Sequence, residues 1–285
     1  MIKNLLGDKE FAKKVFNDLN RFTSANSISL GRLLPQMIYP FFAYSRVAEN
    51  GEKMSTSIPC GNFGDIRGTV LAKEMGLPVS KIICGVNENK EFPRFLYGGR
   101  YRIEPSKTSP SSAMNVSHPS NLARLIEFYN GHMHDERDIK TGKIVKQGVI
   151  TKMPDMDEMK KDICSISISN PEHYETIKKV FEEHNVILDQ HGAIAWNALD
   201  IFFNGNSNLS VIYETADPGK FSDDVKKAIG ITPEIPQRMQ EQSEIEERIY
   251  TIESEPEYSI GEGLKLSDAQ IKEAKDKIKE LFLKK

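Results

Sequence analysis

The sequence has few cysteines and no long apolar run. Its three cysteines, Cys60, Cys84 and Cys164, are far apart and lack the CxxC or histidine spacing of a metal site. They favour free thiols in a reducing compartment, so we expect a cytoplasmic protein. The most apolar stretches, 37–43 and 79–85, are much shorter than the roughly 20 residues that span a bilayer. No membrane segment is therefore predicted, and the charged residues 1–20 predict no secretory signal.

An excess of one charge is also absent. The chain of 285 residues carries 38 basic and 41 acidic residues, interspersed, for a net charge of −3 at pH 7. This balance offers no basic face for a nucleic-acid backbone, so we expect no nucleic-acid partner. His118, His132 and His134 lie close in sequence but have no acidic or cysteine partners at ligand spacing, and no metal site is predicted.

Residues 30–89 predict a strand–helix–strand unit preceded by a helix. The elements are a buried helix over 33–42 with Pro35 near its first turn or at a kink, a strand at 55–58, a glycine turn at 61–64, a helix over 66–75 and a buried strand at 81–86. In an open parallel sheet, ligands bind at the carboxyl ends of the strands. The glycine turn is expected at that edge.

The remainder of the chain continues the α/β pattern. The predicted elements are a polar loop at 130–148, a helix at 171–184 with Asn170 as its N-cap, a strand at 210–213, a surface connection at 233–265 with a helix near 243–248, and a last helix opened by a Ser267–Gln270 capping box. We predict a large domain over residues 1–232 and a C-terminal helical extension, 233–285, that packs on it.

The glycine turn reads Cys60-Gly61-Asn62-Phe63-Gly64-Asp65. A helix N-terminus presents unpaired N–H groups and a partial positive charge, so a glycine turn there binds phosphate without Lys or Arg. Gly61 and Gly64 allow close backbone approach, whereas Asn62 and Asp65 can tie the turn to itself or cap the helix. An ordinary strand-to-helix turn capped by Asp65 is the alternative interpretation.

Several segments resemble threonine synthase in the same order. They include the Asn-Ser-Ile segment, the loop Pro59 to Asp65 with its following helix, an Asn-x-Asn element, a Ser-Ala-Met-Asn block and the run Glu214 to Phe221. The matching ranges are 24–36, 59–78, 87–96, 109–121, 188–193 and 214–221.

The resemblance implies an α/β fold-type-II pyridoxal-phosphate (PLP) enzyme, similar to the tryptophan synthase β chain, with a three-layer αβα open sheet that is incomplete here. It also implies the conversion of O-phosphohomoserine and water to threonine and phosphate. By this resemblance, Gly61, Asn62, Phe63, Gly64 and Asp65 would hold the cofactor phosphate. Thr215 would hydrogen-bond the pyridine nitrogen, which suits a neutral ring.

The same resemblance implies substrate contacts for Asn87, Asn89, Arg94 and Ser112. Arg94 is a candidate because its planar guanidinium matches an oxyanion. The alternatives are turn chemistry after a strand for Asn87 and Asn89, and a surface ion pair for Arg94. His191 is interpreted as a packed or capping histidine in preference to an acid or base.

One expected residue is missing. In the family, the lysine that forms the internal aldimine lies in an N-terminal segment, well before the Asn-Ser-Ile block. This chain corresponds to about the C-terminal three-fifths of the enzyme, and Lys73 and Lys220 lie in the wrong motifs. We therefore assign no catalytic residue. Asp217 and Asn115 stand where the family commonly has His and Asp.

Three hypotheses follow. The chain is a fragment of threonine synthase, inactive alone, whose exposed apolar surface the missing half would cover. Alternatively, it is a non-catalytic module or a split subunit that takes its lysine from a partner chain. The third, a related elimination enzyme such as a cysteate or serine lyase, is disfavoured by the Ser-Ala-Met-Asn and Glu-Thr-Ala blocks.

Overall fold

The computed structural model describes residues 5, 8–16, 29–139, 144–206, 208–247, 249–259 and 263–283. The chain divides into two units. The larger contains residues 26–136 and 146–244, and the smaller contains residues 1–25, 137–145 and 245–285. A boundary at residue 232, with the C-terminal extension packed on the rest, stays a prediction. Residues 24–28 of the Asn-Ser-Ile segment lie outside the described part.

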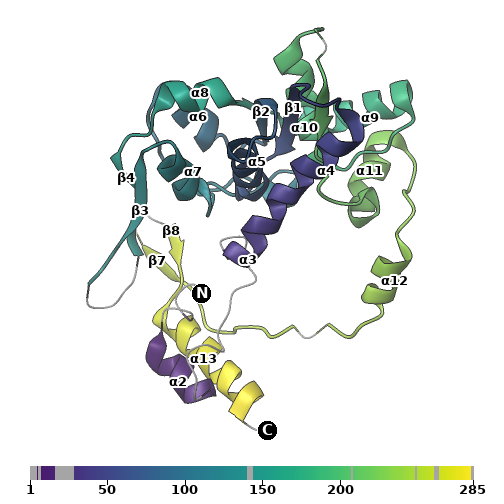
Figure 1. Ribbon diagram of the computed structural model, residues 1–285. Helices are drawn as coiled ribbons and strands as arrows, with labels where there is room; N and C mark the ends of the chain where they lie inside the picture. The colour runs from purple at the N-terminus through teal and green to yellow at the C-terminus, as the bar shows by residue number, and fades with distance from the viewer. Residues whose placement is uncertain are drawn as a thin grey trace. The chain divides into compact units, whose positions relative to one another are not determined.

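A four-stranded parallel sheet forms the centre of the larger unit (Figure 1). Its strands are β1 (Met54–Pro59), β2 (Val79–Val86), β5 (Ile163–Ser167) and β6 (Ser210–Ile212). Their order is β5-β2-β1-β6, and each neighbouring pair is parallel. β1 is buried along its whole length, as expected for an inner strand covered on both faces.

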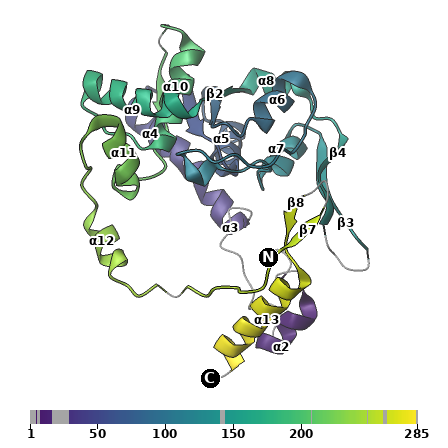
Figure 2. The ribbon, with the colours of Figure 1, turned by 180° about the vertical axis from the view of Figure 1, so that it is seen from behind.

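Helices cover both faces of this sheet (Figures 1 and 2). Side chains alternate along β2: Ile82 and Cys84 face one hydrophobic cluster, and Ile83 faces another. The helices of the first layer are α5 (Gly64–Glu74), α6 (Glu91–Gly98), α7 (Leu122–Phe128) and α8 (Met156–Asp162), and those of the second are α9 (Asn170–His184) and α10 (Gln190–Phe203). The predicted three-layer αβα open sheet is confirmed.

The predicted strand–turn–helix–strand unit is also present. β1 leads through the glycine turn into α5, and β2 returns beside β1. β6 runs parallel to β1 on its other side, so the residues after Ile212 reach the same carboxyl edge as the glycine turn. The sheet therefore brings two segments about 150 residues apart in sequence to one edge.

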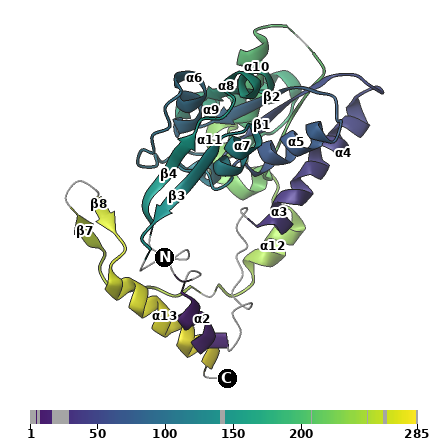
Figure 3. The ribbon, with the colours of Figure 1, turned by 60° about the vertical axis from the view of Figure 1, so that its left-hand side comes forward.

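The prediction that the helix at 33–42 is buried is wrong, because one face of this segment is exposed. The segment contains α3 (Leu30–Leu33), a 3₁₀ turn η2 (Leu34–Met37) that holds Pro35, and α4 (Ile38–Val47). Leu33, Met37 and Phe41 face inward, and Figure 3 shows α4 beside α5. The opposite face carries large apolar side chains that are exposed: Leu30, Leu34, Ile38, Tyr39 and Phe42.

Three other elements differ from the sequence prediction. In place of the polar loop at 130–148, β3 (His132–Arg137) pairs with β4 (Ile144–Lys152). The helix expected near 243–248 lies earlier, as α12 (Gln237–Ser243). α9 is capped by Ser169, one residue before the predicted Asn170, through a capping box with Glu172.

The turn η4 (Pro218–Phe221) and α11 (Ser222–Ile229) follow β6.

The described residues of the smaller unit form the helices α2 (Lys9–Phe16) and α13 (Asp268–Leu283) and the antiparallel strands β7 (Glu257–Ser259) and β8 (Gly263–Lys265). Phe11 and Val15 of α2 pack with Ile278 of α13, and Lys275 pairs with Asp8. The predicted capping box is confirmed, because Gln270 N–H donates to Ser267 Oγ at 3.1 Å. None of the described helices is long and apolar enough to cross a membrane.

Candidate cofactor and substrate site

The glycine turn directs the N-terminus of α5 toward the carboxyl edge of the sheet. Phe63 precedes the helix in a left-handed conformation, with φ 62° and ψ 24°. The Arg67 N–H makes the first bond of the helix, to the Phe63 carbonyl oxygen at 3.1 Å. The preceding N–H groups, of Gly64, Asp65 and Ile66, have no intrahelical partner and are available to an anion.

Packing holds Phe63 in this unusual conformation. A non-glycine residue at positive φ is uncommon and costs energy that its surroundings must offset. Phe63 is buried, and its ring meets Phe92 edge-on with the centroids 4.7 Å apart. The strained turn is thus anchored in the core of the larger unit.

Both glycines of the turn lie against other atoms. A Cβ at Gly61 would lie 2.9 Å from the Ala113 carbonyl oxygen and 3.3 Å from Met114 Cα. A Cβ at Gly64 would collide with the side-chain amide of Gln36. A side chain at either position would therefore displace the walls of the turn.

Asn62 ties the turn to the segment before α7. Its Oδ1 accepts from the Ser120 N–H at 3.3 Å and from the Ser120 hydroxyl at 3.2 Å. Its carbonyl oxygen accepts from the Asn121 N–H at 3.2 Å. Asn62 thus joins two segments, whereas the sequence suggested that it would tie the turn to itself or cap the helix.

A pocket of about 380 Å³ opens at this turn. It is lined by Arg32, Gln36, Ile58, Pro59, Cys60, Gly61, Asn62, Phe63, Gly64, Asp65, Ile66, Ala113 and Thr215. All six residues assigned to the cofactor from sequence, 61–65 and Thr215, are among them. No lysine of the described chain belongs to this lining.

Two charged groups set the electrostatics of the pocket. Arg32 contributes a cation on one wall. Burial raises the pKa of Asp65 to about 6, so its carboxyl group is partly protonated just below neutral pH. Thr69 donates its hydroxyl hydrogen to the Asp65 carbonyl oxygen at 2.9 Å, so this bond involves the backbone of Asp65 and not its carboxyl group.

A buried Asp–His pair, Asp189 and His191, is hydrogen-bonded to Glu214, the residue before Thr215. Asp189 Oδ1 caps α10 by accepting from the Gly192 N–H at 2.7 Å, and its Oδ2 lies 2.8 Å from His191 Nδ1. The Asp189 N–H donates to Glu214 Oε1 at 3.0 Å, which fixes the residue before Thr215. Burial of its carboxyl group, and then the charge of Asp189, raise the pKa of Glu214. His191 is a packed residue here, and its ring also contacts Phe221.

The two asparagines proposed for substrate make contacts within the protein. Asn87 Nδ2 donates to Ser111 Oγ and to Asn115 Oδ1, both at 3.1 Å. Asn89 N–H donates to Asn87 Oδ1 at 3.0 Å, and Asn89 Nδ2 donates to the Lys107 carbonyl oxygen at 3.0 Å. Both are buried. Their observed role is to hold the segment 107–115, and substrate binding by them stays a prediction.

Arg94 and Ser112 also lie outside the pocket lining. Arg94 is exposed, and its guanidinium Nη1 lies 2.8 Å from Glu104 Oε2. This is a surface ion pair, the alternative role that the sequence left open for Arg94. Ser112 begins the 3₁₀ turn η3 (Ser112–Met114), next to Ala113 of the lining. A substrate role for these two residues remains a prediction.

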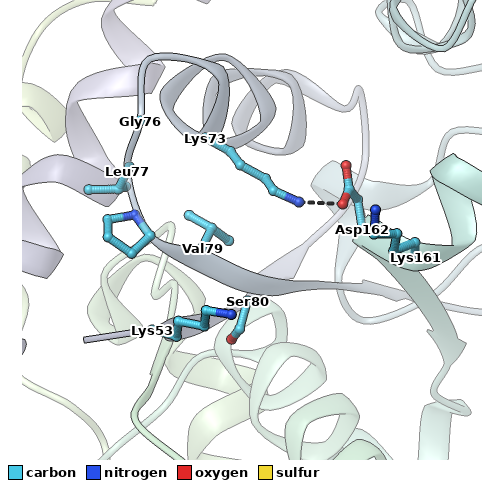
Figure 4. Close-up of a pocket in the computed structure, with 9 residues that line it drawn as sticks. Lys53, Lys73, Gly76, Leu77, Val79, Ser80, Lys161 and Asp162 are labelled. Atoms are coloured by element: carbon cyan, nitrogen blue, oxygen red, sulfur yellow. Dashed lines mark hydrogen bonds and ion pairs between the residues drawn. The ribbon is translucent and has the colours of Figure 1, made fainter. Parts of the chain in front are cut away.

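Lys73 is occupied at the other end of α5. Figure 4 shows it directed at Asp162, with which it forms an ion pair, in a second pocket of about 400 Å³. Tyr129 donates to the other Asp162 oxygen at 3.1 Å. This pocket lies where β2 begins, and so at the edge of the sheet opposite the glycine turn. In the described part of the chain, no three His, Cys, Asp or Glu side chains are grouped to hold a metal ion.

Among the pocket residues that were not assigned from the sequence, Arg32 and Gln36 carry long polar side chains. Both lie in the segment 24–36 that carries part of the resemblance. A cation followed four residues later by an amide, on one side of a helix, is a weak signal by itself. Only the packing of α3 and η2 on α5 places them at the glycine turn.

Comparisons with known proteins agree with this geometry. A family model described as threonine synthase, C-terminal, matches residues 193–259. Threonine synthase of Saccharomyces cerevisiae is 33% identical over 250 residues, covering 80% of this chain and 48% of the yeast protein. That of Pseudomonas aeruginosa is 32% identical over 265 residues, covering 90% of this chain and 54% of the relative.

Solved structures give the same result. PLP-bound threonine synthase from Brucella melitensis superposes with a TM-score of 0.75 at 23% identity, over 99% of this chain and 56% of that one. Threonine synthase from Escherichia coli has a TM-score of 0.64 at 28% identity, over 82% and 50%. The fold is that of the fold-type-II PLP enzymes. Within this class, the chain is a relative of threonine synthase and matches the C-terminal portion of that enzyme. The chain spans about half the length of the yeast and Pseudomonas aeruginosa enzymes.

Proposed function

We propose that this chain is the cofactor- and substrate-binding part of a threonine synthase, a lyase that converts O-phosphohomoserine and water to threonine and phosphate with PLP. One observation carries the proposal. The turn 61–65 and Thr215, assigned from sequence to opposite ends of the same cofactor, line one pocket of about 380 Å³.

The residues of the pocket fit a phosphate ester on an aromatic ring. Support comes from the close packing of Gly61 on Ala113 and of Gly64 on Gln36, which leaves no room for a side chain and keeps the backbone N–H groups of the turn beside the pocket. The first turn of α5 adds the positive end of a helix. Cys60 and Ile58 supply an apolar wall suited to a pyridine ring.

PLP, when bound, would act as an electron sink at the substrate carbons. The chain's own residues would bind and orient it. The N–H groups of 64–66 hold the phosphate, and the Thr215 hydroxyl hydrogen-bonds the ring nitrogen. Because a hydroxyl does not keep that nitrogen protonated, as a carboxylate would, the ring stays neutral. Arg32 offers a charge-assisted bond to an oxyanion of the substrate.

The lysine that the reaction needs is proposed to come from the N-terminal portion of threonine synthase, which this chain does not match. We therefore expect the chain to be inactive by itself and active once that portion is supplied, as one polypeptide or as a partner. We also propose a cytoplasmic location, since three separated thiols suit a reducing compartment.

A second candidate is a non-catalytic module that binds PLP or another phosphate ester. It is favoured by the pocket lining, which contains a complete glycine turn but no lysine among the described residues. Both candidate functions include the binding of PLP or a similar phosphate ester. They differ in whether O-phosphohomoserine is then converted to threonine.

The test is release of inorganic phosphate and threonine from O-phosphohomoserine. We expect no turnover by the chain alone, and turnover when it is co-expressed with the N-terminal portion of yeast threonine synthase. In that complex, Thr215→Val should lower kcat and Thr215→Ser, which keeps the hydroxyl, should retain it. Turnover by the chain alone would contradict the assignment of the lysine. A PLP-loaded complex without turnover would favour the non-catalytic module.

A further inference from the structure

The second pocket, at the edge of the sheet opposite the glycine turn, gathers three lysine side chains. We call it the lysine pocket; its volume is about 400 Å³, and it is lined by Lys53, Lys73, Lys161, Asp162 and residues 76–80. Lys73 comes from α5, Lys161 from α8, and Lys53 from the segment just before β1 (Figure 4). Three cations from separate segments therefore face one cavity, and Asp162 is the one acid among the described lining residues.

The Asp162 carboxylate already has partners within the protein. Its Oδ1 pairs with Lys73, and its Oδ2 accepts from the Tyr129 hydroxyl at 3.1 Å. The Asp162 side chain is 9% exposed, so this ion pair is largely shielded from solvent. Lys73 and Asp162 balance each other, which leaves the charges of Lys53 and Lys161 to other groups.

These two lysines remain available to a ligand. Lys161 Nζ lies 3.3 Å from Glu158 Oε1, but the two side chains are 73% and 52% exposed, and a surface pair of this kind contributes little. Lys53 is exposed and forms no ion pair within the described part of the chain. With three lysines and one aspartate, the lining carries a net charge of +2.

The helix ends beside the pocket do not oppose an anion. A helix C-terminus carries partial negative charge on its unpaired carbonyl groups. At the end of α8, Lys81 Nζ donates to the carbonyl oxygens of Lys160 and Lys161, at 2.7 and 2.9 Å. At the end of α5, the carbonyl oxygens of residues 71–73 accept from the N–H groups of residues 75–77. Both helix ends are therefore satisfied, and the lysines determine the charge of the cavity.

The lining indicates which anion would bind. Lysine binds phosphate as a point charge, without the planar fork by which arginine pairs with a carboxylate. A phosphate monoester carries a charge of about −1.5 to −2 at pH 7, which matches the lining. Leu77, Pro78 and Val79 add an apolar wall, and the cavity is larger than a phosphate group alone requires. A phosphate ester with a small apolar or aromatic group fits both features.

We propose that the lysine pocket is a second ligand site, in which Lys53 and Lys161 hold the head of a small phosphate monoester and residues 77–79 contact its organic group. The two pockets have no lining residue in common, and they lie at opposite ends of α5. The inference therefore does not rest on the proposed function of the glycine turn.

The experiment titrates the full ¹⁵N-labelled chain with phenyl phosphate and, separately, with inorganic phosphate at an ionic strength of about 0.15 M. Lys53→Ala and Lys161→Ala each remove one cation and leave the Lys73–Asp162 pair in place. Lys178→Ala is the matched control, because Lys178 on α9 is likewise exposed and pairs with a glutamate, Glu182, away from the pocket. All three variants should keep the wild-type thermal midpoint, since the replaced side chains are exposed.

We expect phenyl phosphate to shift the amides of residues 76, 77, 79 and 80 in a saturable manner and to bind more tightly than inorganic phosphate. Lys53→Ala and Lys161→Ala should each weaken this binding by roughly fivefold or more, through the loss of one charge-assisted contact. Lys178→Ala should bind as the wild type does, and Lys161→Arg, which keeps the cation, should retain binding. Shifts at the glycine turn, residues 61–66, should be the same in all variants.

Four results would overturn the inference. Shifts at residues 61–66 alone would assign the ester to the cofactor pocket. Shifts at residues 76–80 that do not saturate, or that weaken equally in Lys178→Ala, would show general attraction to a charged surface. Equal affinity for inorganic phosphate and phenyl phosphate would remove the role of the apolar wall.

Discussion

Gly61→Ala would place one methyl group in a tight backbone contact of the glycine turn. The new Cβ would lie 2.9 Å from the Ala113 carbonyl oxygen and 3.3 Å from Met114 Cα. Both neighbours are backbone atoms, which cannot rotate away as the end of a side chain can. Either the turn or the 3₁₀ segment Ser112–Met114 must therefore shift.

The magnitude follows from the cost of overpacking. Inserting a methyl group into a closely packed site typically costs about 1–3 kcal/mol. If the binding geometry of the turn carries that cost, the dissociation constant for PLP rises by a factor of roughly 5 to 150, since about 1.4 kcal/mol corresponds to tenfold.

The assay is calorimetric titration of the chain with PLP and, separately, with pyridoxal, which lacks the phosphate. Gly61→Ala should weaken PLP binding much more than pyridoxal binding. Gly98→Ala is the control, because a Cβ there meets nothing within 4 Å. Unchanged PLP affinity in Gly61→Ala, or equal weakening of both ligands, would refute the phosphate cradle.

Three further changes test other parts of the account. Burial raises the pKa of Asp65 from 3.8 to about 6, so wild-type stability falls as pH rises through this range; Asp65→Asn should be more stable than wild type by up to about 3 kcal/mol at pH 8, and by less at pH 5. Urea unfolding at both pH values checks this, and a difference independent of pH would contradict it. Asn62→Ala removes the acceptor for Ser120 and should cost about 1 kcal/mol and weaken PLP binding, whereas Asn62→Asp keeps the acceptor. Asn87→Ala removes the acceptor of the buried Asn89 N–H and should cost about 2 kcal/mol in urea unfolding; a change below about 0.5 kcal/mol would argue against a structural role.

The parallel sheet was predictable where local signals agreed. Residues 55–58 and 81–86 are short apolar runs on either side of a glycine turn and a helix, and this order specifies a strand–helix–strand unit. β3 was missed because its sequence is mostly polar, and β4 because its apolar residues do not form a buried run and its side chains are partly or fully exposed. These strands are formed by hydrogen bonding between β3 and β4 more than by burial of their side chains.

The burial of α3 to α4 could not be predicted from periodicity. Apolar residues at 33, 37 and 41 and at 34, 38 and 42 occur at the same helical spacing, yet only the first set faces the core. Spacing shows that a helix has apolar faces, and it does not show what covers each face. That information lies in the rest of the fold.

The candidate site was predictable in its two main parts. The turn 61–65 has an intrinsic phosphate-binding pattern, and Thr215 came from the resemblance; the sheet brings both to one pocket. The contacts of Asn87 with Ser111 and of Arg94 with Glu104 depend on loops that no local pattern specifies, and substrate binding by these two residues stays a prediction. Arg32 joins the pocket through tertiary packing alone.

Amide chemical-shift mapping of the ¹⁵N-labelled chain during titration with PLP tests directly whether the glycine turn and Thr215 bind the cofactor. We expect the largest shifts on residues 61–66 and on Thr215, and we expect pyridoxal to shift Thr215 while leaving the N–H groups of 64–66 nearly unchanged. Shifts confined to the second pocket, around Lys53, Lys73 and Lys161, would contradict it.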